Sequence, residues 1–362
     1  MNALSLASII LAITLSACVV LLLIRKAGQL GLVQVPGARS SHVRPTPTGG
    51  GTGIVAGTTA AGLLLLKGTD HALQPASTLL FCGLAMAAIG LIDDRWPLSP
   101  RIRLPAQALL VAAAIWATGG AAALAGEAGT VAAALLAVLL LVGGVWWINL
   151  FNFMDGIDGI AGQQAAAMMA SAMTIALLTT DGAGQSWLWW YMAALAAATL
   201  GFLAFNLPPA RIFMGDAGSL FLGFSIAAIA MASLAAGWVS LPQWLLLAVV
   251  FAADATVTLI VRFLRREQLT EGHRSHAYQR LSRRFGGARP VTLAAAGLNM
   301  LVLLPLALLA GHGVIGWVIV VCVYALAATG ALVAGAGLPD DQPASLGAYR
   351  RLLGRPPVGE RR

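Results

Sequence analysis

Long apolar runs separated by short polar loops constrain this chain more than any other feature of its sequence. Runs of about 17 to 25 residues can cross a hydrocarbon core of about 30 Å as helices. Eleven such runs are read, at residues 2–24, 52–66, 76–92, 104–118, 130–148, 160–179, 187–205, 217–236, 241–263, 291–310 and 313–336. Only 10% of the residues are charged, whereas soluble domains are about one-quarter charged. The expected fold is therefore an all-α, polytopic integral membrane protein.

Positive charges lie almost entirely on one side of the predicted membrane. With the amino terminus outside, 21 of the 22 Lys and Arg residues lie in inner loops or in the carboxyl tail, and Lys67 is the exception. Cytoplasmic loops retain positive charge, so we expect the amino terminus outside and the carboxyl terminus in the cytoplasm. Residues 1–338 are expected to form the membrane domain and residues 339–362 a basic, disordered cytoplasmic tail.

The net charge of +8 does not require a nucleic-acid partner. Inner loops that face anionic lipid headgroups are normally basic, and no segment resembles a nucleic-acid-binding module. Within one apolar run, Gly53 and Gly57 form a G-x-x-x-G pair, which predicts close packing against another helix. The expected surroundings are the lipid bilayer, and no nucleic acid is expected to bind.

Five aspartates lie where apolar runs meet inner loops: Asp93, Asp94, Asp155, Asp158 and Asp216. Three separate regions thus place carboxylates at one depth, as a metal and pyrophosphate site at a membrane surface would require. Two adjacent carboxylates such as Asp93 and Asp94 repel each other unless a cation or a proton lies between them. Taken alone, this pair would equally fit a solvated helix end.

Four polar residues recur at a spacing of three in the second region: Asn149, Asn152, Asp155 and Asp158. In a helical segment they would share one face. Their amide and carboxylate oxygens suit a hard cation such as Mg²⁺ and its phosphate ligands. The region contains no Lys or Arg, so an anion bound there would require a metal. An EF-hand is excluded because the spacing is wrong and no glutamate stands at the twelfth position.

Two further regions leave alternatives open. Asp216 precedes an apolar run, and capping of the following helix would by itself explain an aspartate there. His273 and His276 stand three residues apart in the longest inner loop, beside Arg274. They fit a metal pair, but hydrogen bonding to a diphosphate is at least as natural for histidines next to an arginine.

Together these regions resemble the polyprenyl-phosphate N-acetylhexosamine-1-phosphate transferase superfamily, also called glycosyltransferase family 4. The resemblance covers about residues 30–290, and its matching segments are 92–95, 149–159, 213–219 and 273–279. Residues 39–42 and 273–279 are most similar to the WbpL-type branch, which initiates O-antigen and hence lipopolysaccharide synthesis. The resemblance implies transfer of a sugar-1-phosphate from a UDP-N-acetylhexosamine to undecaprenyl phosphate, with release of UMP.

The resemblance also implies roles for individual residues. Asp216 and Asn152 would bind Mg²⁺ or Mn²⁺, and Asp93 or Asp94 would act as the base toward the acceptor phosphate. The residues implied to bind substrate are Arg39, His42, Asn149, Asp155, Asp158, His273, Arg274 and His276. Gln34, Gly37 and Thr48 depart from the family pattern, so the first inner loop is expected to bind its ligand differently.

The family resemblance places the protein in the bacterial inner membrane, with its active site on the cytoplasmic face and a homodimer expected by analogy. One alternative is a transporter or lipid flippase, since many spans and an intramembrane Asp254 would suit proton coupling. Another is the same chemistry in the peptidoglycan or teichoic acid pathway. Candidate donor sugars differ by a hydroxyl group, which a few loop contacts read, so the sequence leaves the sugar open. We favour a role for Asp254 in supporting the site.

Overall fold

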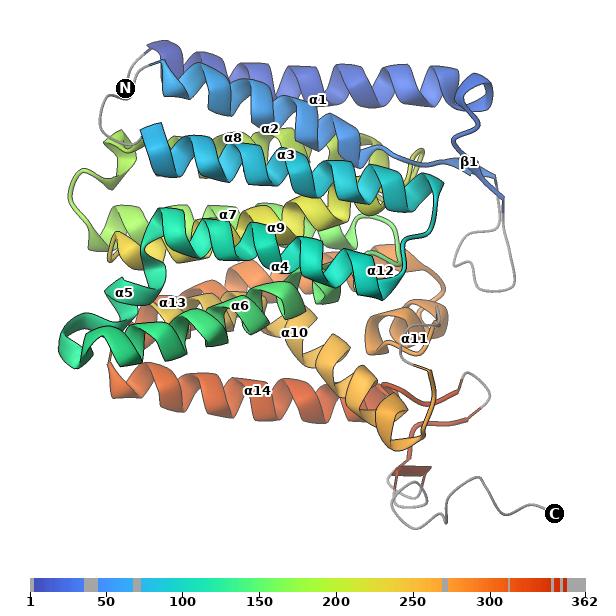
Figure 1. The fold of residues 1–362 in the computed structure, drawn as a ribbon. Coiled ribbons are helices and arrows are strands. Elements are labelled where there is room, and N and C mark those ends of the chain that lie inside the picture. The colour runs from blue at the N-terminus through green and yellow to red at the C-terminus, as the bar shows by residue number, and fades with distance from the viewer. Residues whose placement is uncertain are drawn as a thin grey trace.

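Parallel and antiparallel helices make up most of the computed structural model, which describes residues 3–35, 45–67, 73–268, 273–311, 313–339, 342–345 and 348–349 (Figure 1). The helices are α1 (Ala3–Leu30), α2 (Gly51–Leu66), α3 (Leu73–Arg95), α4 (Pro100–Thr118), α5 (Gly120–Ala125), α6 (Gly129–Phe153), α7 (Ile160–Thr179), α8 (Trp187–Asn206), α9 (Asp216–Ala235), α10 (Leu241–Leu264), α11 (Ala277–Arg284), α12 (Ala288–Leu298), α13 (Leu304–Ala310) and α14 (Val314–Ala334). Short helical turns lie at Gly126–Ala128 and Ala183–Gln185, and a π-helical turn at Asn299–Leu303 joins α12 to α13.

Every predicted apolar run coincides with one of these helices or with a consecutive pair of them. Among the described residues, nine helical segments are long and apolar enough to cross a membrane. The helix α2 is a shorter apolar helix of 16 residues. The prediction of an all-α, polytopic membrane protein is confirmed. The count of eleven spans and the orientation of the termini stay predictions, and the predicted tail, 339–362, lies largely outside the described residues.

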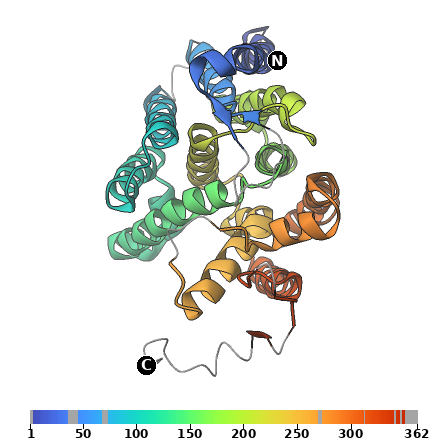
Figure 2. The same cartoon turned by 90° about the vertical axis from the view of Figure 1, so that its right-hand side faces the viewer.

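The helix α9 lies at the centre of the bundle. It packs against α2, α3, α4, α5 and α6, and in Figure 2 other helices surround it. Its buried Phe221 and Phe224 belong to the main core, together with Phe151 of α6 and Phe251 of α10, whose rings are 5.3 Å apart. The starts and ends of neighbouring helices are thereby fixed relative to the first turn of α9.

Glycines set the closest helix contacts. A Cβ atom at Gly53 would lie 2.7 Å from the Ser16 carbonyl oxygen, and Gly57 is equally tight against Ala12 on α1. The predicted close packing at this glycine pair is confirmed. Gly90 allows α3 to approach α9, because a Cβ atom there would lie 2.5 Å from the Cα of Ala217. The ends of α3 and α9 can therefore meet.

A two-stranded antiparallel hairpin, β1 (Val33–Gln34) and β2 (Thr46–Pro47), lies at the same end of the bundle as α11 (Figure 1). The chain after β2 runs beside the segment that leads into α9. Gly50 N–H donates to the Phe213 carbonyl (2.9 Å), and Phe213 N–H donates to the Pro47 carbonyl (2.8 Å). These bonds hold Thr48 next to the start of α9.

Candidate active site

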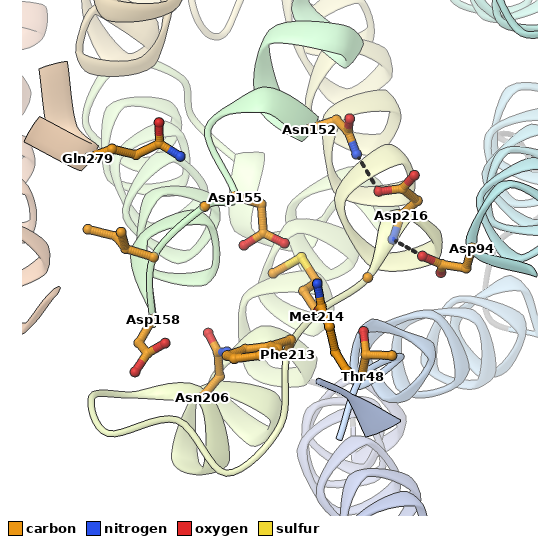
Figure 3. Close-up of a pocket in the computed structure, with 14 residues that line it drawn as sticks. Thr48, Asp94, Asn152, Asp155, Asp158, Asn206, Phe213, Met214, Asp216 and Gln279 are labelled. Carbon is orange, nitrogen blue, oxygen red and sulfur yellow. Dashed lines mark hydrogen bonds between the residues drawn. The ribbon is translucent and has the colours of Figure 1, made fainter. Parts of the chain in front are cut away.

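A cavity of about 350 Å³ opens at this end of the bundle (Figure 3). Its lining residues are Gln34, Thr48, Asp94, Asn152, Asp155, Gly156, Ile157, Asp158, Asn206, Phe213, Met214, Gly215, Asp216 and Gln279. Four of them are aspartates, and none of the described lining residues is Lys, Arg or His. Among the described residues, the cavity therefore presents many oxygen atoms and no cationic side chain to a ligand.

Asp94, at the end of α3, caps the first turn of α9. Its carboxylate accepts hydrogen bonds from the backbone N–H groups of Asp216 (2.8 Å) and Ala217 (3.1 Å). The first N–H groups of a helix have no partner within the helix, and they carry partial positive charge. The N-cap residue is Gly215, whose φ of 77° favours glycine. The sequence-based alternative that Asp216 itself caps this helix is wrong, and its carboxylate faces the cavity.

Asn152, at the end of α6, holds that carboxylate in place. Its side-chain Nδ2 donates to Asp216 Oδ1 (2.8 Å) and to Ser219 Oγ (2.9 Å). Because the amide group uses its nitrogen for both bonds, its oxygen is left for another ligand. Figure 3 shows Asn152 pointing toward Asp216 and the Asp155 carboxylate pointing into the cavity beside them.

Asp155 and Asp158 lie in the loop between α6 and α7. Burial raises the pKa of Asp155 well above that of an ordinary carboxyl group, and the negative charges of Asp216, Asp94 and Asp158 raise it further. Asp158 is tied down, because its Oδ2 accepts a hydrogen bond from the Ala210 backbone N–H (2.9 Å). A divalent cation in the cavity would relieve the repulsion among these groups.

Asp93 and Asn149 lie outside the cavity lining. Asp93 accepts hydrogen bonds from Arg103 Nη1 (2.7 Å) and from the Leu98 backbone N–H (2.6 Å), which fastens the loop between α3 and α4. Asn149 donates to Gln107 Oε1 on α4 (2.7 Å). The expectation that four polar residues share one helical face is wrong, because α6 ends at Phe153 and the last two lie in the loop. The roles assigned to Asp93 and Asn149 stay predictions.

The predicted histidine group lies beside the cavity rather than on its wall. The rings of His273 and His276 stack at 4.8 Å, and His276 Nδ1 lies 3.5 Å from Asp254 Oδ1 on α10. Burial, followed by the charges of His276 and Arg262, lowers the pKa of His273 to about 3, so its ring is neutral at physiological pH. Arg274 is half-buried in the same loop. Arg39 and His42 lie outside the described residues.

The donor set of the cavity fits Mg²⁺. Within the part of the chain that the structure describes, no three His, Cys, Asp or Glu side chains already form a metal-ligand cluster. Mg²⁺ does not need such a cluster, since it usually keeps several waters and binds one or two carboxylates together with substrate phosphates. Asp216 would supply one carboxylate and Asn152 an amide oxygen, with Asp155 nearby.

Several lining residues were not predicted to belong to the site. Gln279 lies three residues after His276, and its neighbour Tyr278 donates a hydrogen bond to the Phe153 carbonyl (3.1 Å). Asn206 accepts from the Gly159 N–H (3.0 Å) and donates to a neighbouring carbonyl, so its role is to hold the loops together. The sequence did single out Gln34 and Thr48, because both depart from the family pattern.

A second cavity, of about 390 Å³ and almost wholly apolar, lies between α10, α12, α13 and α14. The two cavities share a wall. Met154 and Tyr278 line the apolar cavity, and the next residues in the chain, Asp155 and Gln279, line the polar one. A ligand with a charged head and an apolar tail would find both environments side by side.

Comparison with known proteins identifies the family. The model of the family "Glycosyl transferase family 4" matches residues 76–234. The "Probable undecaprenyl-phosphate N-acetylglucosaminyl 1-phosphate transferase" of Bacillus subtilis (strain 168) is 31% identical over 269 residues, which are 71% of each chain. The chain belongs to glycosyl transferase family 4, as its resemblance to that family predicts.

Two other groups of relatives match shorter parts of the chain. The "Decaprenyl-phosphate N-acetylglucosaminephosphotransferase" of Mycobacterium tuberculosis (strain CDC 1551 / Oshkosh) is 35% identical over 222 residues, 56% of this chain and 54% of the relative. The "Undecaprenyl-phosphate alpha-N-acetylglucosaminyl 1-phosphate transferase" of Escherichia coli (strain K12) is 30% identical over 236 residues, 62% of each chain. The match thus spans about half the length of the mycobacterial relative.

Proposed function

We propose that this protein transfers an N-acetylhexosamine-1-phosphate from a UDP-sugar to undecaprenyl phosphate. An oxygen of the acceptor phosphate attacks the β-phosphorus of the UDP-sugar, the bond to the oxygen bridging the two phosphates breaks, and UMP leaves. The product is a lipid pyrophosphate sugar. The observation that carries the proposal is the oxygen-lined cavity formed by Asp94, Asn152 and Asp216, next to an apolar cavity.

Each group in the cavity has a part in this proposal. Asn152 and Asp216 would hold Mg²⁺, which neutralises the diphosphate of the donor. Asp94 keeps the first turn of α9 in place through its two backbone hydrogen bonds. The second pKa of a phosphate monoester is about 6, so the acceptor is largely ionised at neutral pH. Little base strength is needed, and the carboxylates act mainly by positioning.

The names of the relatives support N-acetylglucosamine as the first donor sugar to test. The sequence of residues 273–279 supports the O-antigen branch over the peptidoglycan and teichoic acid pathways. UDP-sugars are cytosolic, so the site would open on the cytoplasmic face of the inner membrane. A transporter has less support, because Asp254 is engaged with backbone N–H groups and the acids gather at one end of the bundle.

The test is UMP release by the purified protein with undecaprenyl phosphate, Mg²⁺ and a panel of UDP-N-acetylhexosamines. Omission of the lipid and addition of EDTA are the controls. Release that needs both lipid and metal supports the transferase and identifies the sugar. Release without lipid would indicate hydrolysis of the donor, and silence across the whole panel would contradict the proposal.

A further inference from the structure

Asp254 joins α10 to the first turn of α11. Its side chain is buried, and its two carboxylate oxygens accept hydrogen bonds from the backbone N–H groups of Ala277 and Tyr278, each at 2.8 Å. Thr258 Oγ1, one turn further along α10, donates to the same carboxylate at 3.1 Å. A buried carboxylate is costly unless donors satisfy it, and here they do. The start of α11 depends on this one side chain.

The same turn of α11 contacts the loop that carries Asp155. The Tyr278 hydroxyl donates to the Phe153 carbonyl at the end of α6 (3.1 Å), and Gln279 lines the polar cavity. A Cβ atom at Gly156 would lie 2.6 Å from Gln279 Nε2, so the loop and the helix touch without spare room. A shift of α11 must therefore move either the loop or the amide of Gln279.

The far side of α11 is held by the chain that follows α14. Arg280 donates to the carbonyls of Pro339 (2.8 Å) and Gln342 (2.7 Å), and Gly337 N–H donates to the Ser275 carbonyl (2.8 Å). With that side fixed, the position of the first turn of α11 relative to the cavity is set by Asp254.

We propose that Asp254 is a positioning residue for the transfer reaction: through the first turn of α11 it places Gln279 in the cavity and braces the Asp155 loop. The expected effect of Asp254 on kinetics rests on the proposed function. Its effect on the position of α11 does not. Gln279 faces the polar cavity, whereas Asp254 and Tyr278 also line the apolar one, so the consequence is not confined to one substrate. Loss of Asp254 raises the KM for the UDP-sugar.

The first experiment uses Asp254→Asn, with Thr258→Val as the control that keeps both bonds to α11. Asparagine has one acceptor oxygen, so one of the two N–H groups loses its partner, and we expect kcat/KM for the donor to fall about tenfold or more. Thr258→Val stays within about twofold. A donor KM in Asp254→Asn that stays within about twofold of the parent value would overturn the proposal.

The second experiment tests the route through α11. Tyr278→Phe removes the hydrogen bond to the Phe153 carbonyl, and the double variant with Asp254→Asn is measured beside both single variants. If Asp254 acts through this turn, the double variant is about as impaired as the worse single variant; effects that multiply would contradict the proposal. Should Asp254→Asn fail to insert, Tyr278→Phe alone must raise the donor KM, and an unchanged KM overturns the route.

Hydrogen exchange gives a result that does not depend on activity. Amides 277–284 and 154–159 of detergent-purified Asp254→Asn should exchange at least about threefold faster than in the parent protein, while α2 and α8 are unchanged. Unchanged exchange in both segments overturns the proposal. If the parent protein transfers no sugar phosphate but the exchange result holds, the proposed function fails and the positioning role of Asp254 stands.

Discussion

The carboxylate of Asp94 accepts a hydrogen bond from the backbone N–H of Asp216 at 2.8 Å, across 122 residues of sequence. This bond joins the end of α3 to the start of α9 at the wall of the polar cavity. Because Asp94 satisfies the helix terminus, the side chain of Asp216 is left to the cavity, where Asn152 orients it. Asp94 thus holds the start of α9, and α9 in turn presents Asp216 to the cavity.

Asp216→Asn should lower metal-dependent transfer by about a hundredfold or more, because metal stabilisation of charge in a transition state is worth several kcal/mol. Membrane insertion should be unchanged. UMP release at several Mg²⁺ concentrations measures the effect. Asp181→Asn, at an exposed turn residue, is the matched control and should be near neutral. Full activity in Asp216→Asn would remove this residue from the mechanism.

Asp93 and Asp94 should differ when each is changed to asparagine. Asp94→Asn disturbs the cavity and should lose activity, whereas Asp93→Asn breaks a partly buried ion pair with Arg103 and should lower thermal stability as well. Removing one partner of a fully buried ion pair costs about 3–5 kcal/mol, and this partly buried pair should cost less. Arg103→Gln should cost a similar amount, and the double variant little more than either. Additive losses of stability would show that the two side chains do not act as a pair.

The acid limb of the pH-rate profile should move to lower pH as Mg²⁺ is raised. The pKa of Asp155 is raised, so this carboxylate gains a proton as pH falls through that raised value. A cation and a proton then compete for the same group of oxygens. Initial rates measured from pH 5 to 8 at low and high Mg²⁺ test this. Ionisation of the acceptor phosphate also contributes to the acid limb, but it contributes to both series. An acid limb that is independent of Mg²⁺ would contradict it.

Gly156→Ala should lower activity by about tenfold, because its Cβ atom would lie 2.6 Å from Gln279 Nε2 and even closer to the Tyr278 hydroxyl. Gly143→Ala on α6 is the control, since a Cβ atom there meets nothing within 4 Å. Alanine favours helix more than glycine does, so the control should be neutral or slightly stabilised. UMP release and thermal unfolding of both variants give the comparison. Equal activity in the two would show that α11 can move freely.

The sequence could predict the helices and the end of the bundle that carries the site. Apolar length alone located every long helix, and the aspartates at the ends of three runs marked the cavity. It could not separate Asp93 from Asp94, because both lie in the last turn of α3, where successive side chains point about 100° apart, and only the packing of α3 against α9 decides which one meets the cavity. Nor could it place Asn149 outside the cavity lining, since the spacing of three assumes a helix that in fact ends at Phe153.

The sequence could not predict contacts between distant segments. The capping of α9 by Asp94 and of α11 by Asp254 each joins two helices whose approach depends on the whole packing. Asp254 was expected only to support the site, with no partner named. Gln279 belongs to the segment 273–279 that matches the family, but the sequence does not show that its side chain reaches the cavity.

The most direct test of the central claim follows the β-phosphate of the donor. The purified protein is incubated with UDP-sugar labelled with ³²P at the β-position, undecaprenyl phosphate and Mg²⁺, and the label is counted in the lipid extract and in the nucleotide. Transfer of a sugar-1-phosphate predicts label in the lipid in equal amount to the UMP formed. Label that stays in UDP while the sugar enters the lipid would show ordinary glycosyl transfer and contradict the account.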